Sequence, residues 1–191
     1  GGGGDNAASA CGIGAVTDGA AFVSIGTSGV MFVSNDKFSP NAARAVHAFC
    51  HAVPGTWHQM GVILSATASL EWLAGVLKTP APQLTKALGT KLSGPSSALF
   101  LPYLSGERTP VGDAQVRGLM MGLGHETDAR TMTHAVLDGV VARRGDLAVG
   151  RGADAPCRSL AFGAELGGLA LTLGLHAPVD RLHVGLGQVD A

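Results

Sequence analysis

An aspartate and an asparagine stand directly after four glycines at the start of the chain, as GGGGDN, and this pair could do chemistry. Glycine lets a backbone approach a small ligand closely, and the side chains of Asp5 and Asn6 can hydrogen-bond to neighbouring hydroxyl groups. A carboxylate beside a substrate hydroxyl can orient it and take its proton during phosphoryl transfer. The alternative is a flexible glycine linker with one solvated carboxylate, and the spacing by itself favours this alternative.

A turn of sequence GTSG at residues 26–29 separates two apolar, β-rich runs at 22–25 and 30–33. Two such runs around a short glycine-flanked turn predict a β-hairpin. Backbone amides and hydroxyls exposed at a turn of this kind can surround a phosphate group. The turn has no lysine and is not a Walker A loop, so a plain hairpin turn is the alternative.

The stretch LPYLSGERTP at residues 101–110 places Glu107, Arg108 and Thr109 between prolines. Such a loop could hold the edge of a ligand. It could also be an ordered surface turn stabilised by a local Glu–Arg pair. Without further context, the surface turn is the favoured interpretation.

Three histidines and a cysteine lie close together in the sequence, at His47, Cys50, His51 and His58. His47 and His51 have the i, i+4 spacing at which two histidines on one helix can bind a metal ion. Ala48 stands where a zinc-protease helix has glutamate, and no further carboxylate or cysteine follows at metal-ligand spacing. We therefore predict structural roles for these residues and no metal site, with a metal-binding module as the alternative.

Hydrophobic periodicity predicts the elements that position these residues. After the hairpin, the pattern predicts a strand at 57–64 and an amphipathic helix at 66–77. Further elements are expected as a short helix within 79–97, an extended segment at 98–104, a strand at 118–123 and a helix from Thr127 to about 141. Strands followed by alternating strands and helices predict a mixed α/β domain.

The composition excludes several classes of protein. With 191 residues, 46% of them hydrophobic, the chain can bury one sizeable core. A charged fraction of 14% and a net charge of −1 provide no basic surface for a nucleic acid. The longest apolar stretch, near 166–175, is too short to span a membrane. Three cysteines without a CxxC pair predict a reducing, cytoplasmic location.

Taken together, five stretches resemble the FGGY carbohydrate kinases in content and order. They are GGGDNAA, SIGTSGV, VHAFCHAVPGTWHQMGVILSA, FLPYLSGERTP and a GLMMGL…AVLDGV segment. The resemblance covers residues 1–141 and is closest to the xylulokinases, since HAFCHAVP and LSGERTP favour them over glycerol kinases and gluconokinases. The last stretch resembles an FGGY signature, except that Thr131 stands where His, Asp, Glu, Asn or Gln is usual.

The resemblance implies an α/β fold, an actin-like ATPase (ribonuclease H-like) domain that is the C-terminal domain of a two-domain sugar kinase. It assigns residues 1–15 to the end of the catalytic loop region from the N-terminal domain and residues 16–141 to the FGGY-type C-terminal domain. The chain opens on glycines and not on methionine. We therefore expect the N-terminal domain to be missing, the fold to be incomplete and the fragment to be inactive alone.

The resemblance also implies a reaction, the ATP-dependent phosphorylation of D-xylulose to D-xylulose 5-phosphate. Asp5 would be the catalytic base that activates the terminal hydroxyl of the sugar, and Asn6 would bind the sugar beside it. The partners would be the sugar, ATP and the N-terminal kinase domain, with no nucleic acid and no membrane. A homodimer stays open.

Five further residues are implied at the nucleotide. Gly26, Thr27 and Ser28 would meet the phosphates of ATP, and Thr67 and Glu71 would line the nucleotide. The family also uses Mg²⁺, which would be held by the phosphates and by carboxylates of the N-terminal domain rather than by this chain.

Residues 142–191 form a divergent or poorly ordered tail in this interpretation. They are rich in Gly, Ala, Leu and Arg and lack lysine and isoleucine. A GC-rich gene read out of frame would give this composition, and so would a loosely ordered tail. A GGGA-like adenosine motif has only partial counterparts, at 167–168 and 182–187. The alternatives to a kinase of xylulose are therefore a non-catalytic truncated remnant or another FGGY sugar kinase.

Overall fold

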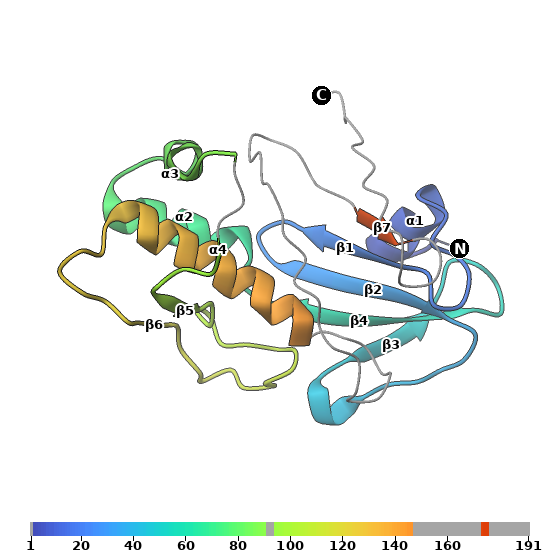
Figure 1. The fold of residues 1–191 in the computed structure, drawn as a ribbon. Helices are drawn as coiled ribbons and strands as arrows, with labels where there is room; N and C mark the ends of the chain where they lie inside the picture. Colours follow the sequence, from blue (N-terminus) through green and yellow to red (C-terminus); the bar gives the residue numbers. More distant parts are fainter. Residues whose placement is uncertain (1, 91–93, 147–172, 176–191) are drawn as a thin grey trace.

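The main element of the fold is a five-stranded antiparallel sheet in the order β3–β4–β2–β1–β7 (Figure 1). The computed structural model describes residues 2–90, 94–146 and 173–175. The strands are β1 (Ala21–Ile25), β2 (Gly29–Asn35), β3 (His47–Cys50), β4 (Trp57–Ile63) and β7 (Leu173–Leu175). A separate hairpin is formed by β5 (Leu99–Leu101) and β6 (Leu119–Met121).

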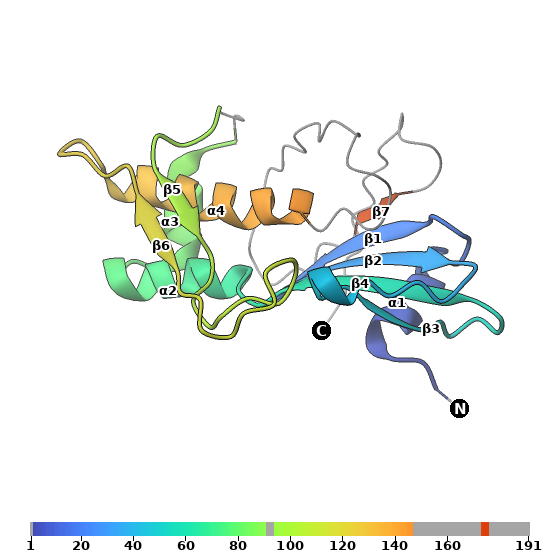
Figure 2. The same cartoon turned by 90° about the horizontal axis from the view of Figure 1, so that it is seen from below.

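Helix α1 (Asp5–Gly12) lies against one face of the sheet, as Figure 2 shows. Its buried side chains, Ala7 and Ala10, are small, so the helix backbone can come close to the strands. Ala10 packs with Phe22 of β1 and Phe32 of β2, whose rings stack with their centroids 4.8 Å apart. This cluster is the core on the α1 side of the sheet.

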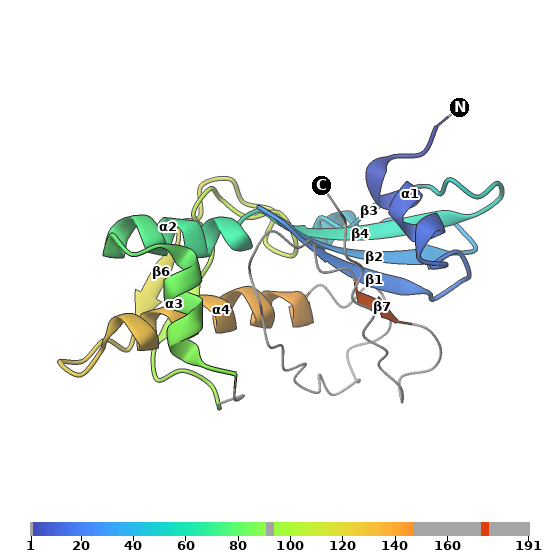
Figure 3. The ribbon, with the colours of Figure 1, turned by 90° about the horizontal axis from the view of Figure 1, so that it is seen from above.

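The remaining long helices extend beyond one end of the sheet (Figure 3). They are α2 (Thr67–Leu77), α3 (Ala81–Leu88) and α4 (Ala129–Asp146), and they share a hydrophobic core with β5. A smaller cluster of Ile63, Ala66 and Val140 joins these helices to the sheet. The corner where β4 passes into α2 therefore lies where the sheet meets the helices. A short 3-10 helix, η1 (Ala42–Arg44), precedes β3.

The expected elements are confirmed, although several of their boundaries shift by a few residues. Strands β1, β2 and β4 and helix α2 occupy the predicted hairpin, strand and helix, and α3, β5 and β6 lie within the later predicted segments. The helix expected from Thr127 begins at Ala129, because the Asp128 carboxylate accepts hydrogen bonds from the amide and hydroxyl of Thr131, each at 2.7 Å. These two bonds hold the pKa of Asp128 below its ordinary value. Thr131, the departure from the family signature, thus completes a helix cap.

The helical spacing of His47 and His51 does not occur, and this part of the metal hypothesis is wrong. His47 opens β3, which pairs along β4 from His47–Met60 to Cys50–Trp57. In extended chain, residues four apart are separated by about 13 Å, too far to share one ion as they would on a helix. Among the residues that the structure describes, no group of three or more His, Cys, Asp or Glu could hold a metal ion.

The tail prediction falls mostly outside the described residues. Of 142–191, the structure describes the end of α4, which runs to Asp146, and β7, which pairs with β1. The partial adenosine motifs at 167–168 and 182–187 lie outside the described residues. Within the described ranges, every helix is too short or too polar to cross a bilayer.

Candidate functional site

The turn between β1 and β2, residues 26–28, is docked on the start of α2. The Ala66 amide donates to the Thr27 carbonyl at 2.8 Å. Thr67 donates to the Gly26 carbonyl twice, from its amide at 3.0 Å and from its hydroxyl at 2.8 Å. The fold therefore brings the predicted phosphate turn and Thr67 together, although about forty residues separate them in the sequence.

This docking occupies the first amides of α2, so they are not available to an anion. The Ala68 amide also donates to the Thr27 carbonyl, at 3.3 Å. The amides and hydroxyls of Thr27 and Ser28 have no hydrogen bond with another described residue. Thr27 is exposed, and a Cβ placed on Gly26 would meet only the Ser28 carbonyl oxygen, at 3.9 Å. The donors of Thr27 and Ser28 are therefore not used by other described residues, as a phosphate-binding turn requires.

Gly29, the first residue of β2, lets the turn lie this close to the β4–α2 corner. A Cβ on Gly29 would lie 2.8 Å from Cγ1 of Ile63 and 3.5 Å from Cβ of Ala66. Ile63 is fully buried and has little room to move aside. From sequence, Gly29 is expected only as part of the hairpin turn, whereas the structure shows that the close approach of β2 to Ile63 also requires glycine there.

Glu71 lies one helical turn after Thr67, on the same side of α2, and is exposed. The Thr67 hydroxyl is engaged by the Gly26 carbonyl, so Thr67 holds the turn in place. Glu71 is the member of the pair that stays open to a ligand. A contact of either residue with nucleotide stays a prediction.

Asp5 and Asn6 form the first residues of α1. Both the amide and the side-chain nitrogen of Asn6 donate to Oδ1 of Asp5, at 2.8 and 3.2 Å. Asp5 is exposed and, among the described residues, its carboxylate accepts hydrogen bonds only from Asn6. Upstream, a Cβ on Gly3 would lie 2.9 Å from Cβ of Ala52, so glycine is needed where the chain passes the loop before β4. No hydrogen bond of the described residues joins Asp5 to the 26–28 turn.

The loop that holds Glu107, Arg108 and Thr109 is not a surface turn, and the interpretation favoured from sequence is wrong. Glu107 and Thr109 are only 2% and 0% exposed, and their side chains reach the backbone of β4 and the residue after it. Glu107 accepts the amide of Arg108 at 2.7 Å, so the local Glu–Arg contact runs through the backbone. Nothing in the sequence marks these two residues as structural partners of β4, because no local pattern indicates a buried long-range hydrogen bond.

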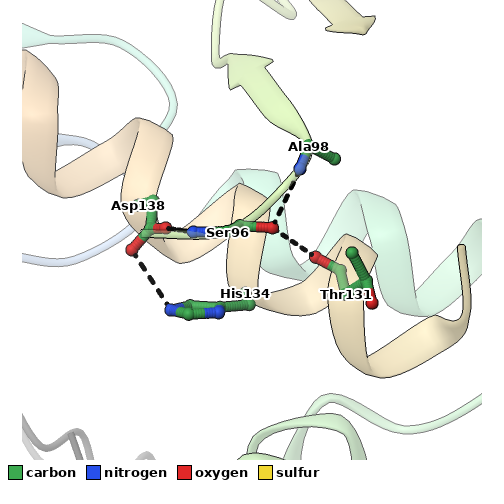
Figure 4. A network of polar contacts seen from close by, with 5 residues as sticks. All are labelled: Ser96, Ala98, Thr131, His134 and Asp138. Carbon is green, nitrogen blue, oxygen red and sulfur yellow. Dashed lines mark hydrogen bonds and ion pairs between the residues drawn. The ribbon is translucent and has the colours of Figure 1, made fainter. Parts of the chain in front are cut away.

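A serine, a histidine and an aspartate also meet at α4, as Figure 4 shows. Asp138 accepts the Ser96 amide at 2.7 Å and lies 3.5 Å from Nε2 of His134. The Ser96 hydroxyl donates to the Thr131 carbonyl at 3.2 Å and accepts the Ala98 amide at 3.3 Å. Since the hydroxyl points to backbone and the carboxylate binds an amide, this group attaches the start of β5 to α4 and is not a nucleophilic triad.

His51 and His58 lie in the core of the sheet rather than around a metal. His58 is 5% exposed and stacks on Phe32, with ring centroids 4.4 Å apart, while His51 meets it edge-on at 5.8 Å. Nδ1 of His51 accepts the Val53 amide at 3.0 Å. Burial, and then the charge of neighbouring His51, lower the pKa of His58. His58 is therefore a neutral core residue near pH 7.

We expect this burial to make the stability of the fold fall in mild acid. The unfolded chain takes up a proton on His58 as the pH falls below its ordinary pKa of 6.5, whereas the folded chain resists it. The His58 contribution to the free energy of unfolding is thus complete above pH 6.5 and decreases as the pH falls through the folded pKa. Urea unfolding at several pH values between 8 and 5 measures this loss.

His58→Phe should flatten that pH dependence, because Phe fills the same aromatic stack and does not titrate. The control is His125→Gln, which removes an exposed histidine and should leave the slope of the parent chain. Equal acid losses in the parent and in His58→Phe would contradict the assignment.

Residues 21–145, more than half of the chain, match the C-terminal domain of the FGGY family of carbohydrate kinases. The chain belongs to this family. Among curated relatives of this FGGY chain, the xylulose kinase of Klebsiella pneumoniae is 46% identical over 143 residues, which are 73% of this chain and 29% of that protein. The FGGY chain thus spans about 29% of the length of that relative.

Solved structures agree with the family and the fold. The crystal structure of a xyloylose kinase from Brucella ovis is 56% identical and matches 75% of this FGGY chain and 30% of its own, with a TM-score of 0.73. A glycerol kinase of Plasmodium falciparum, solved with ADP, has a TM-score of 0.64 at 17% identity and supports the fold alone. The expectation of an actin-like domain from an FGGY sugar kinase is confirmed.

Proposed function

We propose that this FGGY chain forms the nucleotide-side domain of an ATP-dependent kinase that converts D-xylulose to D-xylulose 5-phosphate. One observation carries the proposal: the 26–28 turn has donors that no described residue uses, in a chain whose relatives, up to 46% identical, are named xylulose kinases. Phosphoryl transfer needs positioning and electrostatic stabilisation of the phosphates more than covalent chemistry, and such a turn supplies both.

In this proposal, the amides and hydroxyls of Thr27 and Ser28 bind phosphate oxygens of ATP. Thr67 keeps the Gly26 carbonyl turned toward α2, which holds the turn in place for the phosphates. Glu71, exposed on the next turn of α2, borders the nucleotide. Because the amides of α2 are engaged, the phosphates rest on the turn itself and not on the helix end.

Asp5 is the proposed general base toward the sugar. Its carboxylate is exposed at the start of α1, where it can accept the proton of a bound hydroxyl. The two hydrogen bonds from Asn6 fix Oδ1, which leaves Oδ2 to face the substrate. Asn6, partly buried, would bind the sugar from beside the base.

The proposal takes the divalent cation as part of the substrate, MgATP. The described residues do not fit a protein-held Mg²⁺ site, because no group of three acidic, histidine or cysteine side chains converges among them. The rest of the kinase, including an N-terminal domain, would provide most contacts to the sugar. The free, exposed thiols of Cys11 and Cys50 fit a reducing cytoplasmic location.

The test is a chimeric kinase in which the Klebsiella relative keeps its own N-terminal part and receives this chain as its C-terminal part. With MgATP, the chimera should release ADP in the presence of D-xylulose. Thr27→Val keeps the shape of the side chain but removes one hydroxyl from the phosphates, so kcat/KM for ATP should fall about 10- to 100-fold. The affinity for D-xylulose without nucleotide should stay within a factor of about two.

Thr17→Val, outside the candidate site, is the matched control for the threonine substitution and should keep the parent kcat/KM for ATP. A loss confined to sugar binding in Thr27→Val would contradict the phosphate assignment. Gluconate and glycerol are tested in the same assay, and a preference for either would replace D-xylulose in the proposal. A chimera that binds sugar but transfers no phosphate would favour a non-catalytic remnant.

A further inference from the structure

The outer edge of β4 changes partner half-way along the strand. Strand β3 covers this edge from Trp57 to Met60, where its first residue, His47, ends the pairing. Beyond that point, Thr109 takes over: its amide donates to the Val62 carbonyl at 3.0 Å, and its hydroxyl accepts the Val62 amide at 3.1 Å. A single threonine thus satisfies both edge groups of Val62, as a paired strand would.

Glu107 extends this coverage to the end of the strand. Its Oε1 accepts the amide of Leu64, the residue after β4, at 3.0 Å. The carboxylate is 2% exposed, so this bond is formed away from water, where loss of an acceptor is costly. The Thr109 hydroxyl also donates to the Ala45 carbonyl at 2.9 Å, which fixes the 107–109 segment to the loop before β3.

The chain then passes directly from Leu64 into the corner that holds the 26–28 turn. Ser65, 2% exposed, separates Leu64 from Ala66, whose amide donates to the Thr27 carbonyl. A single peptide unit, between Leu64 and Ser65, therefore separates the peptide held by Glu107 from the peptide that holds the turn. Backbone geometry allows little slack over that length.

We infer that Glu107 and Thr109 are positioning residues for the 26–28 turn and set nucleotide affinity without touching the nucleotide. Glu107 and Thr109 hold the last residues of β4 in place. These residues position the first amides of α2, and the amides hold the Gly26 and Thr27 carbonyls. The link to nucleotide rests on the proposed function, whereas the mechanical coupling does not. A purely structural role would stabilise the whole domain and not this turn in particular.

Amide hydrogen exchange on the complete 191-residue chain, without nucleotide, separates these two roles. Thr109→Val removes the hydroxyl and keeps the β-branched shape. The protection of the Ala66, Thr67 and Ala68 amides should then fall at least about tenfold more than that of Val136, a buried reference in α4. Thr109→Ser restores the hydroxyl and should restore the protection.

The matched control is Thr133→Val. Thr133 is also 0% exposed, but its hydroxyl donates only within its own helix, to the Ala129 carbonyl at 2.7 Å. This variant should not lower protection at 66–68 more than at Val136. If Thr109→Val lowers protection equally at both places, the inference is overturned. Should Thr109→Val not fold, Glu107→Gln is the second variant. It should also lower amide protection at 66–68 more than at Val136, and an equal loss at both places would contradict the inference.

Kinetics of the chimeric kinase test the link to nucleotide separately. Thr109→Val should raise the KM for ATP at least about fivefold and leave the KM for D-xylulose unchanged, because the sugar does not lie on the turn. If Thr109→Val lowers protection selectively at 66–68 but leaves the KM for ATP unchanged, the nucleotide role of the turn is overturned, and with it this part of the proposed function. If protection falls equally at 66–68 and at Val136, only the positioning role is overturned.

Discussion

Asp5→Asn is expected to lower the turnover of xylulose phosphorylation by the chimeric kinase on the order of a hundredfold or more. The amide still hydrogen-bonds a sugar hydroxyl but cannot take its proton at neutral pH. Its oxygen can also still accept the two hydrogen bonds from Asn6, so the start of α1 should keep its shape. The KM for D-xylulose should therefore change far less than kcat. A coupled assay of ADP release measures both.

Asp36→Asn is the control for this substitution. Asp36 is likewise exposed, but it follows β2 and lies outside the candidate site, so its amide variant should retain the parent turnover. Near-normal turnover of Asp5→Asn would remove Asp5 as the base. The pH profile gives a further check, because loss of the base should abolish the acidic limb of kcat while a distorted fold would only scale the profile.

The 191-residue chain by itself is expected to show no D-xylulose-dependent ADP release. Its loss of activity relative to the chimera should be larger than the loss caused by Asp5→Asn. The chain spans about 29% of its xylulose kinase relative, and no hydrogen bond of its described residues joins Asp5 to the 26–28 turn. Holding two reactants in place is worth effective molarities of about 10⁵ to 10⁸ M, which a carboxylate alone does not replace. The loss should therefore amount to several powers of ten.

The measurement compares equal concentrations of the chain, the N-terminal part of the relative, a mixture of both and the chimera. Activity in the mixture or the chimera, with none in either part, is the expected pattern. Xylulose-dependent turnover of the 191-residue chain alone, abolished by Asp5→Asn, would show that the chain contains a complete site.

Local patterns in the sequence predicted the elements that carry the site. The 26–29 turn was recognisable because a glycine-flanked turn between two β-rich runs closes a hairpin whatever surrounds it, and β1 and β2 pair with Ile25 opposite Gly29. Helix α2 was recognisable because its apolar side chains recur at the helical period, and Leu70 and Leu73 are buried as that period requires. The spacing of His47 and His51 fits a helix but carries no information about the partner strand β4, so the helical alternative could be excluded only by the structure.

By itself, the sequence determined which residue types are present at the candidate site, the hairpin that presents Thr27, and the family that five ordered motifs indicate. Only the tertiary structure decided that the first amides of α2 donate to the Gly26 and Thr27 carbonyls, and that Glu107 and Thr109 are buried against β4. These contacts join positions about forty residues apart through backbone amides and carbonyls. Every residue except proline carries both groups, so a sequence contains no mark of which ones will meet.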